Sequence, residues 1–377
     1  MRHPALAEKL VHMVNYVNKH NFLRSVMDFA LSDEQVALAE AERAWLAKND
    51  PLLIRRPTID DGPARIPQDA LGHVAESGVI GLLTSDMGGT HVDLLVLCEE
   101  HGRAASSVPL AELAIACRLL EQIAHPVLED AISGAFPTLP AVGSLETPAL
   151  HADLEGTALR LRGTTAPATG LVDAQGILFL ASTADGTEVA AVVSVDSVAI
   201  RTLETLDHTR SWAVADLDVT LDSGEWSTVP AGTVAFVRDE LSTYRGTDAV
   251  GAASRLLDLT VEYAGQRTQF DKPIGSFQAV KHHCADMALS VEASRAALWA
   301  AAVALDGDDA AVRTRAVSAA AAYAGEGTST SAQTALQVHG GIGFTWEHDV
   351  HLLIRRIKVD ELLDGSVRYH RRRLISA

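Results

Sequence analysis

The sequence predicts an α+β protein in which a helical region, a β-rich region and a helical bundle follow one another. Apolar residues recur at helical spacing in residues 27–136. They alternate with polar residues in short runs in residues 137–230, and helical spacing returns in residues 231–377. Helices and strands that are segregated along a chain are typical of α+β proteins and of separate domains. We therefore expect these three ranges to form domains, with residues 1–26 as an N-terminal extension.

Composition and charge exclude several classes of protein. The 377 residues, 47% of them apolar, can bury large cores in two or three domains. The net charge of −18 opposes binding to nucleic acids and anionic membranes, and the basic run His370–Arg373 is short enough to be a solvated helix end. Cys98, Cys117 and Cys284 lie too far apart for a metal site and are consistent with a reducing compartment.

No segment of the sequence has the pattern of a membrane span or a signal peptide. No apolar run approaches the roughly 18 residues that a membrane-spanning helix needs, and residues 1–26 carry charges and histidines throughout. We expect a cytoplasmic protein that does not bind a membrane.

The first helical region contains recognisable helix starts and ends. Ser32 and Gln35 have the spacing of a capping box at a helix start. Residues 70–83 are typical of a helix that ends at Gly78 and continues into a buried connection. A further helix over residues 94–105 places four side chains on one face: Leu94, Leu97, Cys98 and His101.

The middle region has the period of two that indicates strands. Leu159 and Leu161 begin this pattern, residues 177–180 and 189–200 continue it, and Leu217, Val219 and Leu221 end it. Gly, Asp and Thr punctuate these runs, so we expect a small antiparallel β-domain. The turn at residues 205–210, Thr-Leu-Asp-His-Thr-Arg, either ties its own backbone together or lies near a ligand.

The third region predicts a bundle of long helices. One stripe carries Val250, Leu256, Leu257, Val261 and Ala264, and residues 300–324 are rich enough in alanine for close helix packing.

Two segments of this region place glycines at helix-to-helix junctions. Residues 337–344 read Gln-Val-His-Gly-Gly-Ile-Gly-Phe and follow a long helical pattern, while residues 263–278 join two helical patterns through Lys-Pro-Ile-Gly. Glycines at such junctions let a backbone approach a ligand closely. In this order and at the end of the chain, the two segments resemble the C-terminal half of the acyl-CoA dehydrogenase family.

The beginning of the chain supports the same resemblance. Residues 27–35, Met-Asp-Phe-Ala-Leu-Ser-Asp-Glu-Gln, are similar to the usual first residues of the family, so residues 1–26 are either an atypical helix or lie upstream of the native start. The resemblance implies an N-terminal α-helical domain, a middle antiparallel β-domain and a C-terminal four-helix bundle.

The resemblance also implies FAD-dependent α,β-dehydrogenation of an acyl-CoA thioester. In this reaction a carboxylate removes the α proton and the flavin accepts the β hydride. Family members often carry the base as Glu-Gly-Thr after an Arg-x-x-Lys helix. Here Arg355–Lys358 leads to Leu-Asp-Gly-Ser at residues 363–366, so Asp364, one methylene shorter, occupies the base position. Asp364 is either the catalytic base or the cap of a turn before Gly365.

A second base position of the family lies on the helix that begins the bundle, and it holds Leu241 here. The neighbouring Glu240 would point about 100° away on a helix. Ser242 follows where the family usually has an arginine, which removes an expected CoA contact. Asp364 and Glu240 are therefore both weak candidates for the base.

The bundle half of the family's FAD site matches residue by residue. The resemblance assigns Arg267 to the pyrophosphate and places Phe270 and Gln278 beside the adenosine. Gln337 would supply an amide, and Gly340 and Gly341 would allow close backbone approach. With Ser366, the predicted cofactor-binding residues are Arg267, Phe270, Gln278, Gln337, Gly340, Gly341 and Ser366.

The β-domain half of the FAD site does not match. Residues 144–153 replace a Thr-Glu-Pro-Gly-Ala-Gly-Ser-Asp-like loop, and residues 166–170, Ala-Pro-Ala-Thr-Gly, replace the Trp-x-Thr-Asn-Gly segment that packs against the flavin. The chain thus keeps the bundle residues that would complete the FAD site of a neighbouring subunit, but it lacks the β-domain residues that would hold a flavin of its own. We interpret such a chain as one member of a hetero-oligomer.

The sequence is similar in this respect to the actinobacterial acyl-CoA dehydrogenases of steroid side-chain β-oxidation, which form α2β2 tetramers with fewer flavins than subunits. The resemblance implies an acyl-CoA substrate, a second acyl-CoA dehydrogenase-like subunit that supplies the base, and an electron-transfer flavoprotein or similar acceptor. Two alternatives remain: a homotetramer with Asp364 as its base, and a flavin-free structural or regulatory paralogue.

Overall fold

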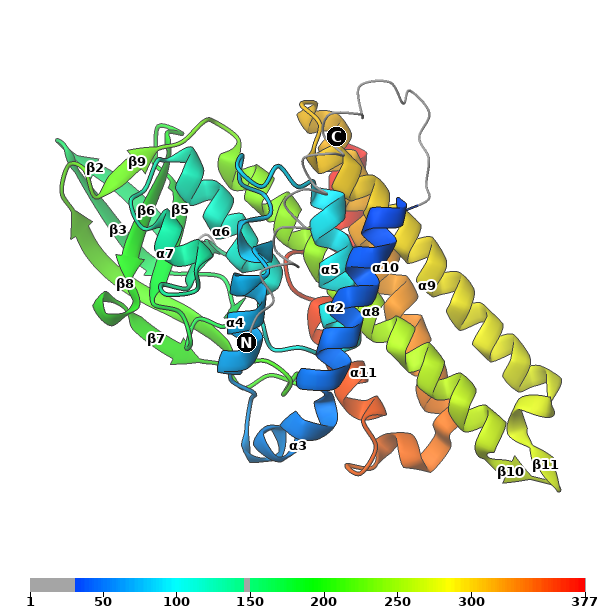
Figure 1. Cartoon of the computed structure of the whole chain (residues 1–377). Coiled ribbons are helices and arrows are strands. Elements are labelled where there is room, and N and C mark those ends of the chain that lie inside the picture. The colour runs from blue at the N-terminus through cyan, green and yellow to red at the C-terminus, as the bar shows by residue number, and fades with distance from the viewer. Residues whose placement is uncertain (1–30, 146–149, 377) are drawn as a thin grey trace.

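A computed structural model describes residues 31–145 and 150–376 of the chain. The β-sheets lie on one side of a central group of helices, and the long helices of the bundle lie on the other side (Figure 1). The order of helices, strands and helices confirms the predicted α+β class. The predicted start at Met27 and the extension 1–26 lie outside the described residues, as does part of the loop 144–153.

The helices before the sheets begin and end where local signals place them. Ser32 and Gln35 form the predicted capping box, in which the Gln35 N–H donates to Ser32 Oγ at 3.2 Å. Gly78 follows one helix with a φ of 79°, and the predicted face of another is buried. These elements are α2 (Asp33–Asn49), α3 (Leu52–Asp61), α4 (Gln68–Glu76), η2 (Val79–Gly81), α5 (His91–Arg103), α6 (Leu110–Gln122) and α7 (Leu128–Ile132).

Two sheets form the middle of the chain. One has the strand order β1-β5-β6-β9, and the other has the order β2-β3-β8-β4, with β7 also paired to β8. Leu159 and Leu161 face the core while Arg160 between them faces outward, as the period of two predicts. The strands are β1 (Thr138–Val142), β2 (Leu150–Glu155), β3 (Ala158–Thr164), β4 (Ala168–Thr169), β5 (Gly176–Ser182), β6 (Glu188–Ser194), β7 (Ala199–Thr202), β8 (Trp212–Leu221) and β9 (Trp226–Thr228).

The described pairs in these sheets are antiparallel except for β1 with β5, which is parallel. The chain from β1 passes through the other sheet before it returns as β5, and such a crossover is what permits a parallel pair.

The bundle consists of four helices, α8 (Thr233–Gln266), α9 (Gln278–Leu305), α10 (Ala310–His339) and α11 (Val350–Asp360). Val250, Leu256 and Ala264 of the predicted stripe are buried, whereas Val261 is 52% exposed and does not belong to the buried face. Between and after these helices lie β10 (Thr268–Gln269), β11 (Lys272–Pro273), η4 (Ile274–Ser276), η5 (Gly340–Phe344) and α12 (Val367–Ser376).

Among the described residues, α9 is the one helix long and apolar enough to cross a membrane, with a mean hydropathy of 1.3 over 18 residues. The expectation that no segment reaches this length was therefore wrong for α9. Core helices of soluble proteins meet the same criterion. Here α9 packs against α8 and α10, with Met287, Val291 and Leu298 buried.

Two glycines allow α5 and α8 to pack backbone to backbone. A Cβ added at Gly102 would lie 2.3 Å from the carbonyl oxygen of Asp248, and a Cβ added at Gly251 would lie 2.1 Å from the carbonyl oxygen of Glu99. Neither obstacle is a side chain that could rotate away. This contact holds the first helical region against the bundle and so determines where α8 lies.

Gly251→Ala is expected to lower the free energy of unfolding by about 1–3 kcal/mol, because the added methyl group forces two backbones apart. Gly265→Ala is the matched control, since it lies on the same helix and an added Cβ meets nothing within 4 Å. The control should raise stability by up to about 1 kcal/mol through helix propensity. Urea denaturation of both variants measures the difference, and equal stability of the two would contradict this packing.

Candidate functional site

The predicted site residues lie in two separate places. Asp364 and Ser366 follow α11, and Asp364 contacts the first half of α8, where it pairs with Arg245. Arg267 caps the far end of α8. At a rise of 1.5 Å per residue, the backbones of Arg245 and Arg267 are about 33 Å apart along the helix. Apart from Ser366, the predicted cofactor-binding residues lie at the Arg267 end of α8 and are remote from Asp364.

Asp364 is held by its backbone and by its side chain. Its carbonyl oxygen accepts a hydrogen bond from Ser242 Oγ at 2.8 Å, and its φ is 54°. Its Oδ2 accepts from Arg245 Nε at 3.2 Å, and the side chain is 16% exposed. Burial raises the pKa of this carboxyl group, and the charge of Arg245 opposes that rise. Asp364 is therefore an ion-pair partner rather than a free carboxylate.

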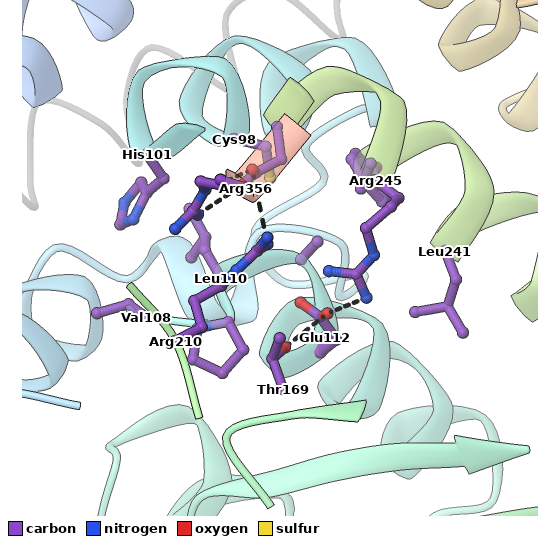
Figure 2. Close-up of a pocket in the computed structure, with 14 residues that line it drawn as sticks. Cys98, His101, Val108, Leu110, Glu112, Thr169, Arg210, Leu241, Arg245 and Arg356 are labelled. Atoms are coloured by element: carbon purple, nitrogen blue, oxygen red, sulfur yellow. Dashed lines mark hydrogen bonds and ion pairs between the residues drawn. The ribbon is translucent and has the colours of Figure 1, made fainter. Parts of the chain in front are cut away.

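The same arginine ties the β-domain to the helices (Figure 2). Arg245 donates to Glu112 Oε1 at 3.0 Å, and the hydroxyl group of Thr169 donates to the same oxygen at 3.0 Å. Thr169 belongs to the segment 166–170 that replaces the family's flavin-packing motif. Its hydroxyl group is buried and used inside the protein, so it is not available to a ligand.

The space around Asp364 is small. The cavity that it lines, together with Ala166, Pro167 and Ser366, has a volume of about 220 Å³. Sites for small molecules and cofactors typically occupy about 300–1,000 Å³. An inner cavity of about 30 Å³, drawn in Figure 2 between Leu241, Arg245 and Glu112, has room for about one water molecule.

Glu240 does not face this site. Its carboxylate accepts from Arg118 at 2.7 Å and lies 3.7 Å from His91 Nε2, while Leu241 lines the inner cavity of Figure 2. Burial raises the pKa of Glu240. The orientation about 100° away from Leu241 agrees with the expectation from helix geometry and leaves Glu240 without a path to a substrate at Asp364.

The turn at residues 205–210 belongs to a buried ion network. Asp207 accepts from the Thr209 N–H at 2.9 Å and from Arg210 Nε at 2.7 Å. Arg210 also donates to Asp360 of α11 at 2.8 Å. These contacts join the turn to itself and to α11, so they support a structural role for the turn.

Arg356 extends this network into α8. It donates to Asp248 at 2.6 Å and to Thr209 Oγ1 at 2.7 Å. Arg210 and Arg245 each lie 5.1 Å from the ring centroid of the buried Trp212. Reasoning from the sequence missed these partners of the turn. The available signal was the presence of arginines among the apolar residues of α8 and α11.

The other predicted residues form an exposed surface at the far end of the bundle, here called the distal face: Arg267, Phe270, Gln278, Gln337, Gly340 and Gly341. The β10–β11 hairpin projects at this end (Figure 1). Phe270 is 85% exposed, and among the described residues Arg267 has no ion-pair partner. The end of α10 meets α8 here through the stacked rings of Tyr263 and His339. The distal face thus presents a cation, an aromatic ring and bare backbone.

Comparisons with a family model and with known proteins both find similarity to acyl-CoA dehydrogenases. Residues 243–377 match the family model described as acyl-CoA dehydrogenase, C-terminal domain. The chain is 33% identical to the acyl-CoA dehydrogenase IpdE2 of Mycobacterium tuberculosis, over 81% of this chain and 92% of that protein. It is 30% identical to the acyl-CoA dehydrogenase FadE34 of the same organism, over 91% of this chain and 48% of that protein. The chain therefore spans about half the length of FadE34.

One solved structure shares the fold over nearly the whole chain. The ChsE4–ChsE5 complex of Mycobacterium tuberculosis superposes with a TM-score of 0.84 at 24% identity, over 93% of this chain and 98% of that one.

The ion network predicts unequal effects for two arginines. Arg356→Ala removes a buried arginine, leaves Asp248, whose side chain is 14% exposed, without its bidentate partner, and should lower the free energy of unfolding by about 3–5 kcal/mol. Arg160→Ala removes an exposed pair between Arg160 and Asp218, whose side chains are 41% and 61% exposed, and should leave the free energy of unfolding nearly unchanged. Urea denaturation distinguishes them, and a small loss for Arg356→Ala would show that the network is dispensable.

Proposed function

The chain belongs to the acyl-CoA dehydrogenase family, and we propose that it is the subunit of a hetero-oligomeric enzyme that completes the FAD site of a partner and does not supply the base. The reaction of the complex is α,β-dehydrogenation of an acyl-CoA thioester. Its substrate class is the CoA esters of steroid side chains, in line with the enzymes that the sequence resembles. An electron-transfer flavoprotein or similar protein would reoxidise the flavin.

The contrast between the two ends of α8 carries this proposal. At one end, the position of the base is occupied by a carboxylate that is already paired with Arg245, beside a cavity of about 220 Å³. At the other end, the distal face is exposed and its arginine has no ion-pair partner among the described residues. The residues present do not fit the flavin ring beside Asp364, and they do fit the adenosine diphosphate part of FAD at the distal face.

Each residue of the distal face has a role in this proposal. Arg267 would donate to the pyrophosphate through its planar guanidinium. Phe270 and Gln278 would contact the adenosine, and the side-chain amide of Gln337 would donate a hydrogen bond. Gly340 has a φ of 61°, and a Cβ at Gly340 or Gly341 would lie in open space where a ligand can approach the backbone. FAD supplies the hydride acceptor when bound.

The partner is proposed to be a second acyl-CoA dehydrogenase-like chain. Arg245, which pairs with Asp364, and Arg267 are about 33 Å apart along α8, so one cofactor cannot contact both places on the same chain. The fold of this chain is also found in the ChsE4–ChsE5 complex, which contains two different proteins. Both observations support a site that is completed between two subunits.

Arg267→Ala is expected to weaken FAD binding by the complex about 10- to 100-fold, because it removes a charge-assisted contact of about 1.5–3 kcal/mol. Arg255→Ala is the matched control, since Arg255 is exposed on the same helix and has no ion-pair partner among the described residues. Titration of the apo-complex with FAD measures both affinities. Equal affinities for the two variants would remove Arg267 from the FAD site.

Asp364→Asn in this chain should leave turnover of the complex within a few-fold of the unsubstituted enzyme. Removal of a general base normally costs about two to four powers of ten in rate. The flavin content and the unfolding midpoint of the variant must be measured as well, since Asp364 pairs with Arg245. A loss of two or more powers of ten with normal flavin content would instead make Asp364 the base and favour a homotetramer.

A further inference from the structure

One buried ring contact connects the two parts of the distal face. The His339 ring stacks on Tyr263 of α8, with ring centroids 4.7 Å apart and planes inclined by 21°. His348, which follows η5, lies edge-on to His339 at 5.2 Å. His339 is the last residue of α10 and is 3% exposed. A single side chain therefore contacts α8 on one side of the face and the segment after η5 on the other.

Tyr263 is linked directly to the arginine of the face. The Arg267 N–H donates to the Tyr263 carbonyl oxygen at 2.8 Å and so ends α8. Among the described residues, the Arg267 side chain makes no hydrogen bond or ion pair that would fix its position. The last turn of α8 orients the Arg267 backbone. The Tyr263 ring of this same turn stacks on His339.

His339 is linked directly to the glycines of the face. Its Nδ1–H donates to the Ala335 carbonyl oxygen at 2.8 Å, which fixes the ring against α10. Gly340 follows with a φ of 61°, and η5 folds back so closely that a Cβ at Gly343 would lie 3.2 Å from His339 Cβ. The glycine turn therefore packs against the His339 residue whose ring stacks on Tyr263.

We propose that the Tyr263–His339 stack is a positioning device that sets the distance between Arg267 and the Gly340–Gly341 turn, and thereby the affinity of this face for the adenosine diphosphate part of FAD. The inference rests on the proposed function. His339 and Tyr263 act through other residues, because the buried His339 ring contacts protein groups rather than the exposed surface.

Ring-removing and ring-keeping variants of the full chain, each in its complex with the partner subunit, test this proposal. His339→Ala and Tyr263→Ala should each weaken FAD binding roughly three- to tenfold, as expected for loss of an aromatic pair. Tyr263→Phe keeps the ring and should bind FAD within about twofold of the unsubstituted complex. His339→Phe should bind FAD more tightly than His339→Ala, because the stack is restored.

FAD titration of the apo-complex is combined with the thermal unfolding midpoint and with gel filtration, which show whether each variant folds and assembles. Lower midpoints with unchanged FAD affinity would make the stack merely structural and overturn the inference. If Arg267→Ala weakens FAD binding and both ring-to-alanine variants do not, the positioning inference fails while the proposed function stands. If Arg267→Ala also has no effect, the proposed function itself fails.

Discussion

The buried ion network between the turn at residues 205–210, α8 and α11 is the interaction on which the arrangement of the chain depends. It sets the carboxylates of Asp207, Asp248 and Asp360 against the guanidinium groups of Arg210 and Arg356. Burial, together with the charge of Asp248, raises the pKa of Asp360, and the charge of Arg210 opposes that rise. Because α11 leads straight to Asp364, the contacts that join the sheets to the bundle also fix this carboxylate against α8.

The same charges explain why one end of α8 is closed and the other is open. Arg245 satisfies Glu112 and Asp364 at once, so an incoming ligand would have to break a buried ion pair before it could use either acid. Among residues 31–145 and 150–376, Arg267 of the distal face has no ion-pair partner, and the face is exposed. The interior around Asp364 is thus stabilised by ion pairs, and the proposed function assigns the exposed surface to a ligand held by another subunit.

Local features of the chain were readable from its sequence, and long-range ones were not. The capping box of Ser32 with Gln35 and the buried face of α5 depend on neighbours a few residues away, so spacing alone predicts them. Arg245 and Glu112 are 133 residues apart, and no spacing pattern links them. The parallel pairing of β1 with β5 likewise depends on the path of the chain. For Asp364, the sequence named a candidate base but could not reveal its ion pair with Arg245.

The amount of FAD bound per chain tests the central claim most directly. The chain should be purified alone and in complex with its partner subunit, and flavin absorbance should be compared with protein concentration. The account predicts little FAD on the chain alone and a yellow complex that holds fewer flavins than subunits. A stable assembly of this chain alone that carries one FAD per chain would contradict it.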